Sequence, residues 1–219
     1  MEAQQIATLV HGTYLIESPE PLAGAPLLVG FHGYGENAAI HLAELARIPG
    51  ASRFLLCSVQ ALHPFYNKAG EVVGSWMTRH DRERAIDDNV RYVAAVVARL
   101  RREHSGEAVG ERLVYAGFSQ GSAMAYRAAA GSGHPCRGVI VLGGDVPPEL
   151  AARELPGFPP VLLGRGAREQ WYDEAKMAHD IQVLQAKGVD VRPLVYPGGH
   201  EWTDEFREAA GAFLAEVCP

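Results

Sequence analysis

Residues 112–130 read RLVYAGFSQGSAMAYRAAA, and this stretch decides the fold. The apolar run at residues 113–116 is typical of a buried strand, and the small residues at 122–130 favour a helix. Between them, residues 117–121 (GFSQG) have the G-x-S-x-G pattern of a nucleophile elbow, a sharp strand-to-helix turn that exposes its central serine. We therefore predict that the Ser119 hydroxyl points clear of a sheet, beside the start of the helix.

Strands and helices alternate along the rest of the chain. Continuous apolar runs predict buried strands, and apolar residues that recur at steps of three and four predict helices. The predicted strands are residues 27–31, 53–59, 113–116, 138–142, 160–163 and 191–196, and the predicted helices are residues 37–47, 81–104, 122–130, 172–187 and 203–217. This alternation indicates one α/β domain over residues 1–219, with a mostly parallel sheet covered by helices on both faces.

Two regions depart from this alternation. Residues 5–10 and 13–17 are β-prone runs separated by His11 and Gly12, which favours an antiparallel N-terminal hairpin at the edge of the sheet. Residues 60–80 have no clear periodicity and carry aromatic residues among proline and glycine. Loops of this length are usually functional, so we expect a lid or a binding wall, with a packed surface meander as the alternative.

Composition and charge argue against several classes of function. The chain of 219 residues is 47% hydrophobic and 21% charged, which is ordinary for a globular protein. Its formal net charge of −6 argues against binding to nucleic acid or to anionic membranes. Three cysteines suit a reducing compartment, and we find neither a signal peptide nor an apolar run of membrane-spanning length. We therefore expect a cytoplasmic protein without integral membrane association.

The sequence predicts neither a metal nor a cofactor. The nine histidines and three cysteines lack the H-E-x-x-H pattern and any clustered ligand spacing. A phosphate-binding loop of the G-x-x-x-x-G-K-[ST] pattern is also missing from the sequence. The predicted chemistry therefore depends on side chains and backbone amides.

Four segments follow predicted strands directly: the HGYG loop at residues 32–35, the Ser119 turn, the Glu169 region and His200. Because ligands bind at the carboxyl ends of the strands in such sheets, these segments should lie together at one edge. Ser119 needs a general base, and histidine titrates nearest neutral pH. We choose His200 because two glycines precede it and because the chain order Ser…acid…His fits this type of fold.

A catalytic histidine needs an acid that holds its tautomer and stabilises the imidazolium. Glu169 is our first choice, because it follows the strand at residues 160–163. Asp173 in the same segment is the second choice. Asp145, after the preceding strand, is the third. The sequence leaves these three carboxylates open.

The oxyanion of an acyl-transfer intermediate needs backbone N–H donors. The residue after the nucleophile, Gln120, supplies one amide, and the HGYG loop supplies the other, most plausibly that of Tyr34. We expect His32 to brace this loop. Trp76, Met77, Trp171 and Tyr172 are candidates for the wall of an acyl pocket beside Ser119, although aromatic residues also fill cores.

Four motifs resemble the phospholipase/carboxylesterase family, which includes acyl-protein thioesterases and bacterial carboxylesterases. They are HGYGE at residues 32–36, AGFSQGSAMA at 116–125, GGD-x-P at 143–147 and GGHEW at 198–202. The resemblance implies an α/β-hydrolase fold and an esterase or thioesterase with a Ser-His-acid triad and no cofactor. It assigns the nucleophile to Ser119, the base to His200 and the oxyanion amides to Tyr34 and Gln120. The family usually carries an aspartate as the acid, whereas the matching stretch here ends in Glu169.

The expected function is that of a serine carboxylesterase, with thioesterase or lysophospholipase activity as variants. Its substrate would be a small-molecule or lipid-like ester, cleaved through an acyl-enzyme. The alternatives are a small-ligand-binding protein on the same fold that has no catalytic activity, and a peptidase or lactonase on the same scaffold. The sequence leaves open the acyl-chain length, the leaving group and the oligomeric state, a homodimer among the options.

Overall fold

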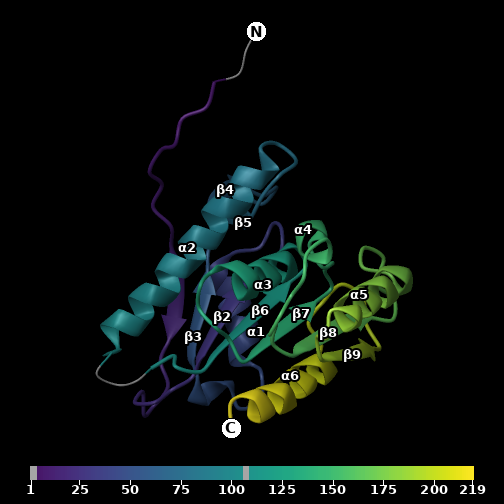
Figure 1. Cartoon of the computed structure of the whole chain (residues 1–219). Coiled ribbons are helices and arrows are strands. Elements are labelled where there is room, and N and C mark those ends of the chain that lie inside the picture. The colour runs from purple at the N-terminus through teal and green to yellow at the C-terminus, as the bar shows by residue number, and fades with distance from the viewer. Residues whose placement is uncertain (1–3, 106–108) are drawn as a thin grey trace.

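A seven-stranded sheet forms the centre of the computed structural model, which describes residues 4–105 and 109–219 (Figure 1). The strand order is β1-β3-β2-β6-β7-β8-β9, and every pairing is parallel except that of β1 with β3. The strands are β1 (Tyr14–Glu17), β2 (Leu27–Phe31), β3 (Leu55–Val59), β6 (Leu113–Phe118), β7 (Gly138–Leu142), β8 (Val161–Gly166) and β9 (Val191–Tyr196). The predicted α/β fold with a mostly parallel sheet is confirmed.

Helices cover both faces of the sheet because its central strands are apolar on both sides. The helices are α1 (Ala38–Ala46), α2 (Arg82–Glu103), α3 (Gln120–Gly131), the short α4 (Pro148–Ala151), α5 (Glu174–Ala186) and α6 (Asp204–Val217), with a 3-10 turn at Ala51–Arg53. Alternate residues of β6 belong to two different cores: Tyr115 lies in the core that includes residues of α2, α3 and α5, and Ala116 lies in the core that includes residues of α1 and α6. Figure 1 shows α2 and α3 lying across the near face.

The N-terminal hairpin was predicted only in part. The antiparallel edge is confirmed, but its partner is β3, with Ile16 opposite Cys57. Residues 4–13 form no strand; they run away from the sheet along the N-terminal end of α2 (Figure 1), and the side chain of Ile6 is 91% exposed. Tyr92 of α2 holds the end of this segment, because its hydroxyl donates to the carbonyl oxygen of Thr13 at 2.6 Å. The apolar side chains of Leu9 and Val10 in this segment are exposed as well.

Residues 60–80 contain a small hairpin that the sequence pattern did not indicate. Strand β4 (His63–Tyr66) pairs antiparallel with β5 (Val72–Ser75). The hairpin is joined to the loop after β2 by two backbone hydrogen bonds, from Gly35 N to Gly74 O at 3.0 Å and from Gly74 N to Glu36 O at 2.8 Å. The expected lid or binding wall is thus a two-stranded element attached to the HGYG loop, and its part in binding stays a prediction.

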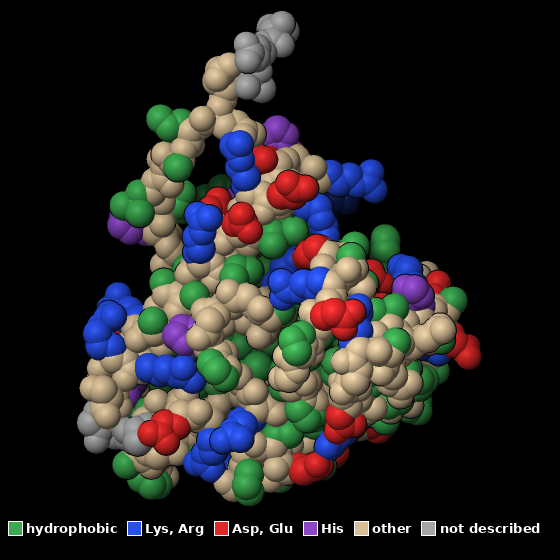
Figure 2. All heavy atoms as spheres, viewed as in Figure 1, with side chains coloured by type: hydrophobic (Ala, Val, Ile, Leu, Met, Phe, Trp, Pro, Cys, Tyr) green, Lys and Arg blue, Asp and Glu red, His purple; other side chains and the backbone are tan. Residues whose placement is uncertain are grey.

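The molecular surface carries charges of both signs. Figure 2 shows Lys and Arg side chains interspersed with Asp and Glu over the face that carries α2. Among the residues that the structure describes, no helix is both long and apolar enough to cross a bilayer.

We expect Gly121→Ala to destabilise the fold strongly. A Cβ atom at this second residue of α3 would overlap the carbonyl oxygen of Phe31 in β2. Overpacking an interior costs roughly 1–3 kcal/mol. The three nearest atoms are all backbone atoms of Phe31 and His32, which leaves little room to relax, so the free energy of unfolding should fall by about 3 kcal/mol. Urea denaturation measures it. Gly131→Ala in the same helix meets only Val90 Cγ1 at 3.4 Å and should stay within about 1 kcal/mol of the wild type. Equal stability of the two variants would contradict the prediction.

Candidate active site

The turn between β6 and α3 holds Ser119 in a strained conformation. Its φ of 54° and ψ of −119° lie in a region that residues with side chains rarely adopt. The turn can close because Gly117 has no Cβ atom, which would overlap the carbonyl oxygen of Gly121. The Ser119 amide donates to Leu142 O in β7 at 2.8 Å, and its carbonyl accepts from the Ser122 amide at 3.0 Å. These contacts hold the half-buried hydroxyl at the carboxyl edge of the sheet.

His200 reaches Ser119 from the loop that follows β9. Its Nε2 atom lies 2.8 Å from Ser119 Oγ, which is hydrogen-bond distance. The imidazole packs on the Phe118 ring, with ring centroids 4.8 Å apart. Gly143, with a φ of +65°, also lies close to the ring, since a Cβ atom added there would stand 3.0 Å from the imidazole. The ring is therefore held in place, and it stays partly open to solvent.

Glu169 is the carboxylate that contacts this histidine. Its Oε2 atom is hydrogen-bonded to His200 Nδ1, and its Oε1 atom accepts from the Trp171 amide at 2.7 Å. The side chain is almost fully buried. Burial raises the pKa of Glu169, but the hydrogen bonds from the Trp171 amide and from His200 outweigh burial, so that the pKa lies below its usual value. The carboxylate is thus ionised at neutral pH and fixed in orientation.

The two other candidate acids lie elsewhere. Asp173 is the N-cap of α5, and its Oδ1 atom accepts from the Lys176 amide at 2.9 Å. Asp145 is exposed in the loop after β7. Within the described part of the chain, neither carboxylate is hydrogen-bonded to His200.

Two backbone amides face the same edge of the sheet near Ser119. The Gln120 amide belongs to the first turn of α3, where helix N–H groups have no partner within the helix. Tyr34 lies between two glycines whose amides are both occupied, Gly33 N by Glu36 Oε2 at 2.7 Å and Gly35 N by Gly74 O at 3.0 Å. The Tyr34 amide itself takes part in no hydrogen bond among the described residues.

His32 and the Gln120 side chain brace these amides. His32 is fully buried; its Nε2 atom accepts from the Ala61 amide at 3.1 Å, and its Nδ1 atom therefore carries the proton and donates to Gly33 O at 2.7 Å. Burial lowers the pKa of His32, which keeps the ring neutral. Gln120 Oε1 accepts from the Trp76 amide at 2.8 Å, and Gln120 Nε2 donates to Met77 O at 2.9 Å. The expected brace is observed at His32, whereas the role of the Gln120 side chain escaped the sequence analysis.

The four predicted pocket residues do not form one exposed surface. Trp76 and Tyr172 are fully buried, and each donates inside the protein: Trp76 Nε1 to His32 O at 2.8 Å, and the Tyr172 hydroxyl to Asp180 Oδ2 at 3.0 Å. Met77 is also buried. Trp171 is the exception, with 75% of its surface exposed. The Tyr34 side chain is exposed as well and stacks on Phe65 of β4, with ring centroids 5.3 Å apart.

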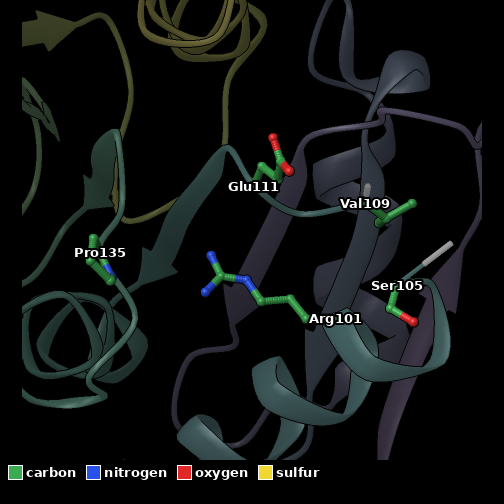
Figure 3. Close-up of a pocket in the computed structure, with 5 residues that line it drawn as sticks. All are labelled: Arg101, Ser105, Val109, Glu111 and Pro135. Atoms are coloured by element: carbon green, nitrogen blue, oxygen red, sulfur yellow. The ribbon is translucent and has the colours of Figure 1, made fainter. Parts of the chain in front are cut away.

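A separate hollow of about 420 Å³ lies at the other end of the sheet (Figure 3). It is lined by Arg101, Ser105, Val109, Glu111 and Pro135. Strand β6 begins just after Glu111 and ends just before Ser119, which separates the two places by roughly 20 Å of extended chain. The Arg101 guanidinium donates two hydrogen bonds to Gly110 O there, from Nε at 3.0 Å and from Nη2 at 2.8 Å. No group of three or more potential metal ligands occurs among the residues that the structure describes.

A serine on a strand-to-helix turn of a mostly parallel sheet, facing a histidine from the loop after the last strand, is the arrangement of the α/β-hydrolases. Within that class, the chain belongs to the phospholipase/carboxylesterase family, whose model matches residues 12–218. No curated protein matches the chain.

Solved structures of the same fold cover nearly the whole chain. Esterase PE8 is 22% identical with a TM-score of 0.72, over 95% of this chain and 100% of its own. The Bacillus cereus carboxylesterase is 15% identical with a TM-score of 0.75, over 94% of each chain. Acyl-protein thioesterase 2 of Zea mays is 20% identical with a TM-score of 0.67, over 94% of this chain and 99% of its own. At these levels of sequence identity, the similarity to the solved structures shows a shared fold.

We expect Gln120→Ala to lower the free energy of unfolding by about 1–3 kcal/mol. The variant leaves the Trp76 amide and the Met77 carbonyl without their partner, and a buried polar group that loses its partner costs that much. Thermal or urea unfolding measures the loss. Gln182→Ala, at an exposed position of α5, is the matched control and should stay within about 0.5 kcal/mol of the wild type. If the Gln120 variant is as stable as the control, the hydrogen bonds of the Gln120 side-chain amide do not stabilise the fold.

Proposed function

We propose that the protein is a serine hydrolase that cleaves carboxylic esters, or thioesters, through an acyl-enzyme. The observation that carries the proposal is the continuous hydrogen-bond chain from Ser119 Oγ through His200 to Glu169. Membership of the phospholipase/carboxylesterase family supports the class of reaction. Ser119 and His200 are both only partly buried, so that a substrate and water can reach them.

In the first half of the reaction, His200 Nε2 accepts the proton of Ser119 as Oγ attacks the carbonyl carbon of the ester. The amides of Tyr34 and Gln120 donate to the oxyanion that forms on the former carbonyl oxygen. The intermediate then expels the alcohol or thiol, which leaves with the proton held by His200. This step leaves the acyl group on Ser119.

In the second half, water replaces the alcohol. His200 Nε2 accepts a proton from the water molecule as its oxygen attacks the acyl carbon, and the same two amides hold the second oxyanion. Its collapse releases the carboxylic acid and returns the proton to Ser119. Glu169, ionised and held by the Trp171 amide, keeps His200 in the tautomer with a proton on Nδ1 and stabilises the imidazolium in both halves.

We expect Ser119→Ala and His200→Ala each to lower kcat/KM by roughly 10⁴- to 10⁶-fold, because both groups act as one unit in the transition state. Hydrolysis of p-nitrophenyl esters with acyl chains of two to sixteen carbons measures the rates. A fluorophosphonate should label the wild type at Ser119 and leave Ser119→Ala unlabelled. Retention of more than a few per cent of the activity in either variant would overturn the assignment. A wild type that neither reacts nor hydrolyses would favour a ligand-binding protein.

We expect Glu169→Gln to lower kcat by roughly 10³- to 10⁴-fold, because its amide can donate to His200 Nδ1 and so favours the wrong tautomer. Asp173→Asn is the control, since asparagine caps a helix as well as aspartate does, and its rate should equal that of the wild type. Steady-state kinetics on the best p-nitrophenyl ester provide both values. The opposite pattern, a slow Asp173 variant and a fast Glu169 variant, would move the acid to Asp173.

A further inference from the structure

Glu36 folds back onto the loop that carries the Tyr34 amide. Its Oε2 atom accepts from the Gly33 amide at 2.7 Å, and its own amide donates to Gly33 O at 3.3 Å. Its carbonyl accepts from the Gly74 amide of β5 at 2.8 Å. One residue thus ties together both peptide groups of Gly33 and the β4–β5 hairpin.

These bonds fix the direction in which the Tyr34 amide points. The Gly33 carbonyl and the Tyr34 N–H belong to one planar trans peptide, so the two groups point in opposite directions. The Gly33 carbonyl oxygen accepts from two donors, His32 Nδ1 at 2.7 Å and the Glu36 amide at 3.3 Å. The Tyr34 N–H is therefore directed away from them.

The Glu36 carboxylate also lies close to the histidine and serine end of the site. A Cβ atom on Gly33 would stand 3.1 Å from both Glu36 Oε2 and Phe118 Cδ1, so the carboxylate and the Phe118 ring crowd the same glycine. The Phe118 ring also packs on the His200 imidazole. The side chain of Glu36 is partly buried, which suits a fixed carboxylate rather than a solvated one.

We propose that Glu36 is a positioning residue, whose carboxylate aims the Tyr34 amide at the oxyanion by holding the neighbouring Gly33 amide. The inference rests on the proposed ester hydrolysis and adds a residue to it. Glu36 acts through the backbone of the loop and touches no reacting atom.

The surroundings of the Glu36 side chain agree with this role. Burial raises the pKa of Glu36 above its usual value, although the hydrogen bond from the Gly33 amide opposes that rise. Of the charged groups nearby, Glu44 on α1 raises the pKa of Glu36 and His200 lowers it. Glu44 is itself paired with Arg207 of α6.

The test compares two variants of similar size. E36M has no oxygen that can accept from the Gly33 amide, and E36Q keeps one. We expect E36M to lower kcat by tenfold or more with KM changed less than about threefold, because an oxyanion donor acts in the transition state. E36Q should retain at least a third of the wild-type kcat, because its amide oxygen can still accept from the Gly33 amide. Thermal melting confirms that each variant is folded.

The controls separate this inference from the proposed function. Glu208→Ala removes an exposed glutamate of α6 and should leave kcat unchanged. Ser119→Ala, assayed beside it, tests the reaction itself. If Ser119→Ala is inactive while E36M keeps wild-type kcat, the positioning role fails and the proposed function stands. An E36Q variant as slow as E36M would also overturn the role of Glu36.

Discussion

The close approach of three backbone segments at the elbow is the constraint on which the rest of the site depends. Gly121 brings the first turn of α3 against the carbonyl of Phe31 at the end of β2, and Gly117 brings the end of β6 against the carbonyl of Gly121. Both contacts require that no Cβ atom is present. They force Ser119 into its strained conformation. Because β2 runs directly into the HGYG loop, the same contacts place the Tyr34 amide and the Gln120 amide on the same edge of the sheet.

Three side chains around the elbow, those of His32, Glu36 and Gln120, hold backbone groups. His32 and Glu36 hold the two sides of Gly33, and Gln120 holds the segment at Trp76 and Met77. Such buried networks are strong when every member is paired, because the local dielectric constant is low. A preorganised donor needs no reorganisation during the reaction. Glu169 is held in the same way, because its Oε1 atom accepts from the Trp171 amide.

The central strands and helices could be predicted because their signals are local: β2, β7 and β9 have the expected bounds. The meeting of Ser119, His200 and Glu169 at one edge follows from parallel topology, since each residue comes after a strand. Strand pairings between segments that are distant in sequence could not be predicted in this way. The β-prone residues 5–10 carry no information about which strand would accept them, and β1 pairs with β3 instead. The hairpin of β4 and β5 shows no alternation from which it could be recognised.

The burial of aromatic residues is the clearest case in which tertiary contacts decide the role of a side chain. Sequence alone could assign Trp76 and Tyr172 to a pocket or to a core, and the structure buries both with their polar atoms paired inside the protein. Trp76 supports the residues around Ser119 through two hydrogen bonds: its indole Nε1 donates to His32 O, and its backbone amide donates to Gln120 Oε1. Large apolar side chains that remain exposed at this edge include Trp171, whose amide donates to Glu169, and Tyr34, which stacks on Phe65. The loops after β2 and β8 thus each carry an exposed aromatic side chain at the same edge of the sheet as Ser119, whereas Trp76 and Tyr172 belong to the core.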